Sequence, residues 1–324
     1  MSGLTVVFGN GAVGRLVTDA LVKRGDEVRI AQRSRPADVA PDVQFERCDI
    51  LDPEDVRRAV HGASQVLLSV GFAYDARVWR TAWPTTMRNI VKACEAVDAR
   101  VVFIDNLYQL GAQSEARRED MPLTRRGGKP GALAETTRIW MAASDRVRFA
   151  ALRCTDFYGP GVTVSHLGES ALGELAKGRA AQLVVPPDTP HDFAYVPDIA
   201  KAALILLDAP DDAYGQVWNM PCAPTRTPRD LLRLAAKAIG VRPKVLAIPF
   251  WLLPLAGLFA RFMKEVVDVG FTWDRPYHVD AAKFTRRFAF TSTPFEIGIP
   301  AAIHSFRLAE KPPSPIMPGA ISAA

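Results

Sequence analysis

Three glycines near the N-terminus constrain the fold of this chain more than any other feature. Gly9, Gly11 and Gly14 follow the apolar run Thr5–Phe8 and open the amphipathic run Ala12–Arg24. This order predicts a buried strand, a tight turn and a helix packed closely on that strand. The unpaired N–H groups and the positive dipole end of such a helix favour a bound dianion, although a glycine turn without a ligand is the alternative. We therefore expect a dinucleotide-binding turn formed by Gly9, Asn10, Gly11, Ala12, Val13 and Gly14.

Strands and helices alternate over the first half of the chain. Such alternation is typical of right-handed βαβ units and a parallel sheet. Asp52 followed by Pro53 marks the start of a helix, because an acidic N-cap residue and a proline at the first position both favour one. The expected strands are 5–8, 27–31, 43–48, 64–70, 100–104 and 147–152, and the expected helices are 12–24, 77–97 with an interruption near Pro84, and 132–144 after a polar connection over 105–131.

The second half of the chain has a looser pattern, with frequent proline and glycine after Cys154. Short strands at 182–185 and 217–220 and helices at 197–208 and 227–239 are expected there. The fold class predicted is α/β, a Rossmann-type doubly wound parallel sheet with a smaller C-terminal substrate-binding lobe. The expected division is a dinucleotide-binding domain over 1–153, a mixed α/β lobe over 154–309 that partly completes the sheet, and a mobile tail over 310–324.

Composition excludes several other classes of protein. A net charge of +5 over 324 residues, with no dominant basic block, argues against a nucleic-acid partner. The cysteines are scattered and form no metal-binding pattern, so we expect no metal and a reducing, cytoplasmic location. Because the N-terminus enters a predicted strand directly, we expect no signal peptide.

The most apolar stretch, Val245–Ala260, contains Pro249 and Pro254 and is too short to cross a bilayer. No membrane partner is expected, and the stretch is interpreted as a core or substrate-pocket helix. The aromatic residues Trp251, Phe271, Trp273 and Tyr277 are expected to line an apolar pocket or the core.

The end of the second strand indicates which dinucleotide binds. In such folds an acidic residue there holds the ribose hydroxyls of NAD. This chain has Gln32 followed by Arg33 and Ser34, so no carboxylate repels a 2′-phosphate and a guanidinium can bind it. NADP(H) is therefore predicted in preference to NAD(H), and the alternative is that Arg33 and Arg35 are solvated surface charges.

Two other strand ends complete the expected cofactor site. Asp49, with Ile50 after it, follows the third strand, where a carboxylate can accept a hydrogen bond from the adenine amino group. Ser69, Val70 and Gly71 end the fourth strand and would line the path toward the nicotinamide.

Together these features resemble the extended short-chain dehydrogenase/reductase superfamily, in particular its NAD-dependent epimerase/dehydratase-like branch. The resemblance covers the chain from Leu4 to about residue 305. The motifs on which the resemblance rests are specific for the fold and much less specific for the chemistry. They lie at 9–14, 48–52, 102–108, 152–153 with 157–161, and 187–200.

The family's Tyr-x-x-x-Lys pair is missing. There, a lysine lowers the pKa of a tyrosine that exchanges a proton with the substrate. None of the six tyrosines of this chain has a lysine four residues later. If Glu135 is used as the anchor, the tyrosine position is Gly127, the lysine position is Gly131, and the family's serine becomes Asp105 or Asn106.

Four residues are candidates to replace that pair. Lys129 lies in the same segment, Tyr108 follows the fifth strand, and Tyr158 follows the sixth. His191 stands where relatives carry a substrate-contacting arginine, and histidine suits acid–base work near neutral pH. Each has a purely structural alternative: the tyrosines can hydrogen-bond across the core, and His191 can cap a turn.

These observations predict an NADP(H)-binding oxidoreductase that acts on a hydrophobic carbonyl, enone or imine with a non-standard proton donor. The alternatives are a non-redox isomerase, cyclase or lyase, and a redox-silent NADP(H)-binding regulatory protein. The expected partner is a small-molecule substrate. The resemblance also implies a homodimer through the helices at 77–97 and 132–144.

Overall fold

The computed structural model describes residues 3–37, 39–247, 249, 252 and 261–309. At its centre lies a seven-stranded parallel sheet in the order β10-β6-β5-β4-β1-β2-β3. The chain runs outward from β1 to β3 and then returns to the other side of β1, so the order reverses between β1 and β4. The seven strands are β1 (Leu4–Phe8), β2 (Val28–Gln32), β3 (Gln44–Arg47), β4 (Ala63–Leu68), β5 (Arg100–Asp105), β6 (Phe149–Arg153) and β10 (Gln216–Asn219).

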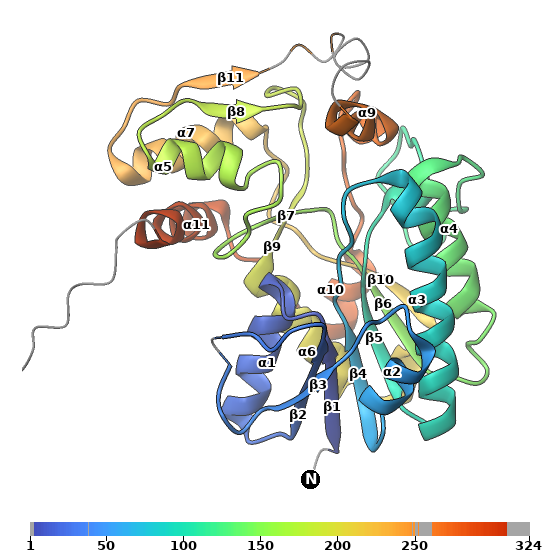
Figure 1. The fold of residues 1–324 in the computed structure, drawn as a ribbon. Helices are drawn as coiled ribbons and strands as arrows, with labels where there is room; N and C mark the ends of the chain where they lie inside the picture. Colours follow the sequence, from blue (N-terminus) through green and yellow to red (C-terminus); the bar gives the residue numbers. More distant parts are fainter. Residues whose placement is uncertain (1–2, 38, 248, 250–251, 253–260, 310–324) are drawn as a thin grey trace, which may run out of the picture.

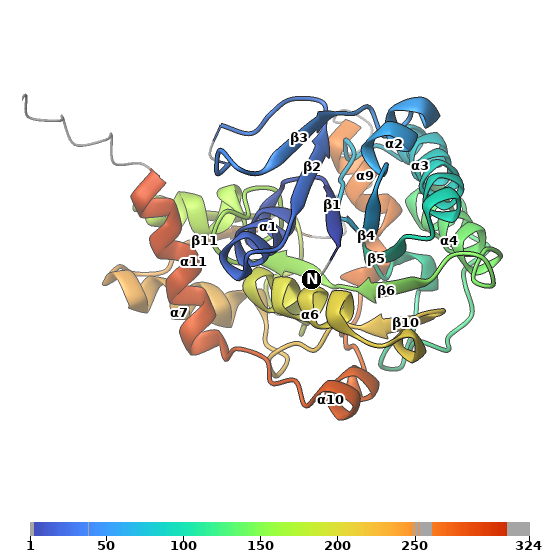
Figure 2. The ribbon, with the colours of Figure 1, turned by 90° about the horizontal axis from the view of Figure 1, so that it is seen from below.

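Helices cover both faces of this sheet (Figures 1 and 2). Side chains alternate along a strand, so Val6 packs under one helical layer and Val7 under the other. One layer holds α1 (Ala12–Arg24) and α6 (Val196–Asp208), and the other holds α2 (Pro53–Ala59), α3 (Ala76–Val97) and α4 (Gly128–Met141).

A second, smaller group of elements packs beyond the carboxyl ends of the strands (Figure 1). It has its own core, in which Leu183, Leu232 and Ile303 are buried. Its elements are β7 (Asp156–Tyr158) paired with β9 (Phe193–Tyr195), β8 (Ala181–Leu183) paired with β11 (Val245–Ala247), the π-helical η2 (Glu169–Gly173), α5 (Glu174–Ala176), α7 (Pro228–Ile239) and α11 (Phe295–Ala309). The remaining elements are the 3₁₀ turns η1 (Tyr108–Leu110), η3 (Asp211–Ala213) and η5 (Gly270–Thr272), and the helices α9 (Arg261–Asp268) and α10 (Ala282–Phe288).

The predicted doubly wound sheet is confirmed, and α1 has the predicted bounds. The prediction of an interruption near Pro84 is wrong, because α3 continues through it. A proline inside a helix removes one backbone hydrogen bond. The buried side chains of Trp79, Trp83 and Met87 on either side of Pro84 hold α3 against the sheet despite that loss.

The start of the next helix is also earlier than predicted. Helix α4 begins at Gly128, not at Ala132. The prediction of a helix over 245–260 is wrong at its beginning, because residues 245–247 form the strand β11. Trp251 and most of that stretch lie outside the described residues, as does the tail 310–324.

The predicted cap of α2 is confirmed. The Asp52 side chain accepts hydrogen bonds from the backbone N–H groups of Glu54 and Asp55, and Pro53 occupies the first turn. This cap begins α2 directly after the loop that follows β3.

A pair of glycine substitutions tests the packing of α1 on β1. A Cβ at Gly14 would lie 1.9 Å from the backbone oxygen of Gly9, whereas a Cβ at Gly11 has open space around it. Gly14→Ala should therefore lower the free energy of unfolding by about 2 kcal/mol or more. Gly11→Ala should lower it by less than about 1 kcal/mol. Urea unfolding curves of the two variants measure the difference, and equal losses would contradict the packing described.

Candidate functional site

The glycine turn joins β1 to α1 at the carboxyl edge of the sheet. Gly9 has a φ of 88°, a conformation that favours glycine. Gly11 is the N-cap residue of α1 and has no side chain to accept from the first N–H groups. Those N–H groups and the helix dipole are therefore available to an anion in front of α1.

Side chains from two neighbouring strands hold the turn in place. The Ser69 hydroxyl donates to the backbone oxygen of Gly9 at 2.8 Å. The Asn10 N–H donates to Oε1 of Gln32 at 3.0 Å, and Nε2 of Gln32 donates to the backbone oxygen of Ser34 at 2.7 Å. Gln32 thus ties the end of β2 to the glycine turn.

The residues predicted for the adenosine end lie at the ends of β2 and β3. Arg33 and Ser34 are exposed directly after β2. Asp49 lies in the loop after β3, and its Oδ1 accepts a hydrogen bond from the Leu51 N–H at 3.0 Å. The backbone oxygen of Ile50 accepts from Asn89 at 3.1 Å.

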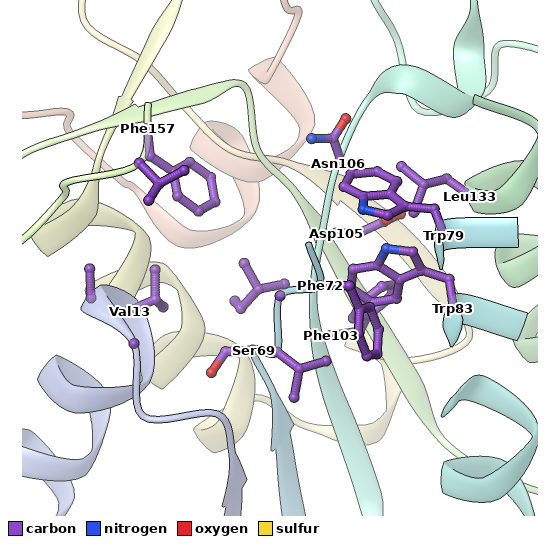
Figure 3. Close-up of a pocket in the computed structure, with 16 residues that line it drawn as sticks. Val13, Ser69, Phe72, Trp79, Trp83, Phe103, Asp105, Asn106, Leu133 and Phe157 are labelled. Atoms are coloured by element: carbon purple, nitrogen blue, oxygen red, sulfur yellow. The ribbon is translucent and has the colours of Figure 1, made fainter. Parts of the chain in front are cut away.

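A cavity of about 310 Å³ begins at the glycine turn and crosses the carboxyl ends of β4 and β5 (Figure 3). Its walls are mostly apolar and aromatic. Trp79 and Trp83 of α3 stand on one side and Phe157 on the other (Figure 3). The lining residues are Gly11, Ala12, Val13, Ser69, Val70, Gly71, Phe72, Trp79, Trp83, Phe103, Ile104, Asp105, Asn106, Leu133, Phe157 and Val164.

Neither tyrosine candidate is among the residues that line this cavity. Tyr108 is buried behind Trp79, with the two rings stacked at 6.3 Å, and its hydroxyl hydrogen-bonds that of Tyr74. Tyr158 packs between Tyr195 and Phe295 in the core of the smaller group. Burial raises the pKa of both phenols well above the ordinary value, which opposes proton transfer near neutral pH.

Lys129 lies on α4 and is completely buried. Its Nζ lies 2.6 Å from Oε2 of Glu265 and 3.5 Å from Oδ2 of Asp268, both on α9. The backbone N–H of Lys129 also donates to Asp268 at 2.8 Å. The structure therefore places Lys129 in an ion-pair cluster that joins α4 to α9, where the sequence had suggested a contact with the ribose.

His191 is completely buried in a stack of rings in the smaller group. Its ring lies between Trp273, at 3.8 Å, and Tyr277, at 4.6 Å, and the guanidinium of Arg117 covers Tyr277 at 3.6 Å. Nε2 of His191 lies 2.9 Å from Oδ2 of Asp156, although the two groups do not meet hydrogen-bond geometry. The prediction that Trp273 and Tyr277 form pocket or core is confirmed, since both are core residues.

Asp105, the last residue of β5, is one of the two residues that the sequence places at the family's serine position. It lines the cavity, and its Oδ2 accepts from Nε2 of Gln109 at 2.7 Å. Nε of Arg153 lies 3.4 Å from the same oxygen. The signal in the sequence is a pair of opposite charges at the ends of two adjacent buried strands, β5 and β6.

Within the described ranges, no helix has the length and apolar character needed to cross a membrane. The same ranges contain no group of three His, Cys, Asp or Glu side chains placed to hold a metal ion.

The ion-pair cluster around Lys129 yields a stability prediction. Lys129→Met removes the cation and leaves Glu265 and Asp268 facing an apolar side chain, so the free energy of unfolding should fall by about 3 kcal/mol or more. The matched control is Arg57→Gln, which breaks the 2.8 Å pair with Glu54 on the surface. Its cost should be below about 1 kcal/mol. Urea unfolding measures both, and a Lys129→Met loss as small as the control's would show that the cluster is not structural.

Comparisons with known proteins agree with this geometry. The model of the NAD dependent epimerase/dehydratase family matches residues 5–220, more than half of the chain. A dTDP-6-deoxy-L-talose 4-dehydrogenase (NAD(P)(+)) of Kitasatospora kifunensis is 26% identical over 272 residues, which are 76% of this chain and 82% of that protein.

Solved structures share the fold at low identity. The WbmH enzyme of Bordetella bronchiseptica in complex with NAD+ matches with a TM-score of 0.75 and 16% identity over 95% of this chain and 99% of its own. The UDP-glucuronic acid 4-epimerase of Bacillus cereus, in complex with UDP-glucuronic acid and NAD, matches with a TM-score of 0.77 and 15% identity over 94% and 99%. The chain belongs to the NAD-dependent epimerase/dehydratase family.

Proposed function

We propose that this protein is an NADP(H)-dependent oxidoreductase that reduces the carbonyl, enone or imine group of a small, largely apolar molecule. The observation that carries the proposal is the cavity itself. It begins at a glycine turn suited to a pyrophosphate and continues between aromatic walls to the ends of β4 and β5. The Kitasatospora kifunensis relative is named as a dehydrogenase, which supports redox chemistry on this fold.

The residues present fit a dinucleotide. Gly14 lets α1 start close to β1, and the N–H groups after Gly11 would hold the pyrophosphate. Arg33 and Ser34 would bind the 2′-phosphate, while Asp49 and Ile50 would flank the adenine. Ser69, Val70 and Gly71 would border the nicotinamide half. When bound, the cofactor supplies or accepts a hydride.

The aromatic walls favour an apolar substrate over a sugar. Phe72 packs edge-on against Trp83 at 5.1 Å, and Trp79 meets Trp83 at 6.0 Å. Such surfaces bind apolar and aromatic groups and offer few hydrogen bonds to sugar hydroxyls. A sugar-nucleotide substrate, as in the name of the Kitasatospora kifunensis relative, is the second candidate. In either case residues 154–309 would supply the substrate lobe.

The proposal also includes a cellular compartment and an oligomeric state. All four cysteines are free thiols in the structure, which suits a reducing, cytoplasmic compartment. A homodimer would form through α3 and α4, which lie side by side on one face of the sheet (Figure 2).

The preference for NADP(H) is tested at Arg33. Arg33→Asp should reverse the preference to NAD(H), because a carboxylate repels the 2′-phosphate and accepts from the ribose hydroxyls. Arg33→Gln should weaken NADP(H) binding about tenfold and leave NAD(H) binding unchanged. Arg35→Gln is the matched control, since Nη2 of Arg35 already donates to the backbone oxygen of Val43 at 3.3 Å. Isothermal titration gives the dissociation constants. An unchanged ratio of the constants for NADP(H) and NAD(H) in both Arg33 variants would contradict the proposed role of Arg33.

The substrate class is tested by NADPH oxidation against a panel of ketones, enones and imines, together with a dTDP-4-keto sugar. The apolar compounds should turn over faster. Phe157→Ala removes part of the cavity wall and should raise the KM of the accepted compound about tenfold. Phe288→Ala should leave KM unchanged, because Phe288 packs against Trp218 and Phe284 away from the cavity.

Three other outcomes of the panel would contradict the proposal. Turnover of the sugar nucleotide alone would favour the activity named for the Kitasatospora kifunensis relative. Turnover without added nicotinamide would favour a non-redox enzyme. Tight NADP(H) binding with no turnover would favour a regulatory protein.

A further inference from the structure

Asp105 combines burial with a place in the cavity wall. It is 4% exposed, and it lines the cavity together with Asn106 and Ser69 (Figure 3). As the last residue of β5, it stands two strands away from β1 and its glycine turn, across β4. If the pyrophosphate lies at that turn, the reacting half of the dinucleotide extends toward Asp105.

The two carboxyl oxygens of Asp105 have different surroundings. Oδ2 is held by Gln109 at 2.7 Å and by Arg153 at 3.4 Å. Oδ1 is buried, and within the described part of the chain no donor meets it. A buried oxygen without a partner is costly. The arrangement therefore orients the carboxyl group through Oδ2 and leaves Oδ1 without a protein partner in a residue that lines the cavity.

Burial and the polar groups around Asp105 act in opposite directions on its protonation. Burial raises the pKa of Asp105 to about 6, even though Arg153, the Asn106 N–H and Gln109 favour the carboxylate. Arg153 is itself buried, and the charge of Glu119 also favours its cationic form. The Cys154 thiol also faces Asp105 and stays protonated, because burial raises its pKa. Both forms of the Asp105 carboxyl are therefore accessible near neutral pH.

We propose that Asp105 is the acid–base residue of this site. The inference rests on the proposed reductase function. As a hydride adds to the carbonyl carbon of the substrate, the Asp105 acid gives its proton to the carbonyl oxygen. The C=O π bond would be replaced by a C–H and an O–H bond, so the substrate would be reduced to an alcohol with NADPH as the hydride source. Asp105 would be left as a carboxylate and would regain its proton from solvent.

This role predicts a pH effect on binding that is independent of turnover. The nicotinamide ring is cationic in NADP⁺ and neutral in NADPH. An ionised Asp105 beside it would strengthen the binding of NADP⁺ and leave NADPH nearly unaffected. As pH rises from 5 to 8, the affinity for NADP⁺ relative to NADPH should rise about tenfold.

The experiment is isothermal titration with NADP⁺ and NADPH at pH 5 and pH 8, using the wild-type protein and the Asp105→Asn and Asp188→Asn variants. Asp105→Asn keeps the shape but cannot ionise, so its affinity ratio should not change with pH. Asp188→Asn alters an exposed carboxylate paired with Arg229 and should retain the wild-type effect. Asp105→Asn should also lower the rate of reduction about a hundredfold.

If Asp105→Asn does not fold, NMR titration of the wild-type Asp105 carboxyl carbon replaces it. Its midpoint should lie near the pKa of about 6 and should fall with NADP⁺ but not with NADPH. Binding of both nucleotides with a ratio that is independent of pH, or that changes equally in Asp105→Asn, would overturn this inference alone. Failure of both nucleotides to bind would overturn the proposed function as well.

Discussion

The structure depends on the close approach of α1 to the end of β1. Gly14 makes that approach possible, because any larger residue would place its Cβ against the Gly9 oxygen. Two side chains hydrogen-bond to the backbone of the glycine turn: Ser69, which follows β4, and Gln32, which ends β2. Three strand ends are thus held around one turn, and the N–H groups of α1 face the carboxyl edge of the sheet. In doubly wound sheets this edge, at the reversal of strand order, is where ligands bind.

Helix α9 shapes the same edge from a distant part of the chain. Glu265 accepts from the Ala76 N–H at the start of α3, and Asp268 accepts from the Lys129 N–H at the start of α4. Carboxylates at helix N-termini are favourable for the dipole as well as for hydrogen bonding. Because α3 carries Trp79 and Trp83 into the cavity, this cluster also fixes one of its aromatic walls.

The sequence predicted the features that depend on neighbours in the chain. The glycine turn, the bounds of α1 and the Asp52 cap all follow from local patterns. The start of α4 does not, because its capping carboxylate is Asp268, 139 residues away from Lys129. The surroundings of Tyr108, Lys129, Tyr158 and His191 could not be predicted for the same reason, because their contacts also come from distant parts of the chain. The pairing of Asp105 with Arg153 requires β5 and β6 to lie side by side, in a register that the sequence does not state.

The most direct measurement of the central claim is a crystal structure of the protein with NADP⁺ bound. The account predicts the pyrophosphate at the first turn of α1, the 2′-phosphate beside Arg33, and the nicotinamide ring in the aromatic cavity next to Asp105. A nucleotide bound elsewhere, or a ring outside that cavity at full occupancy, would contradict it.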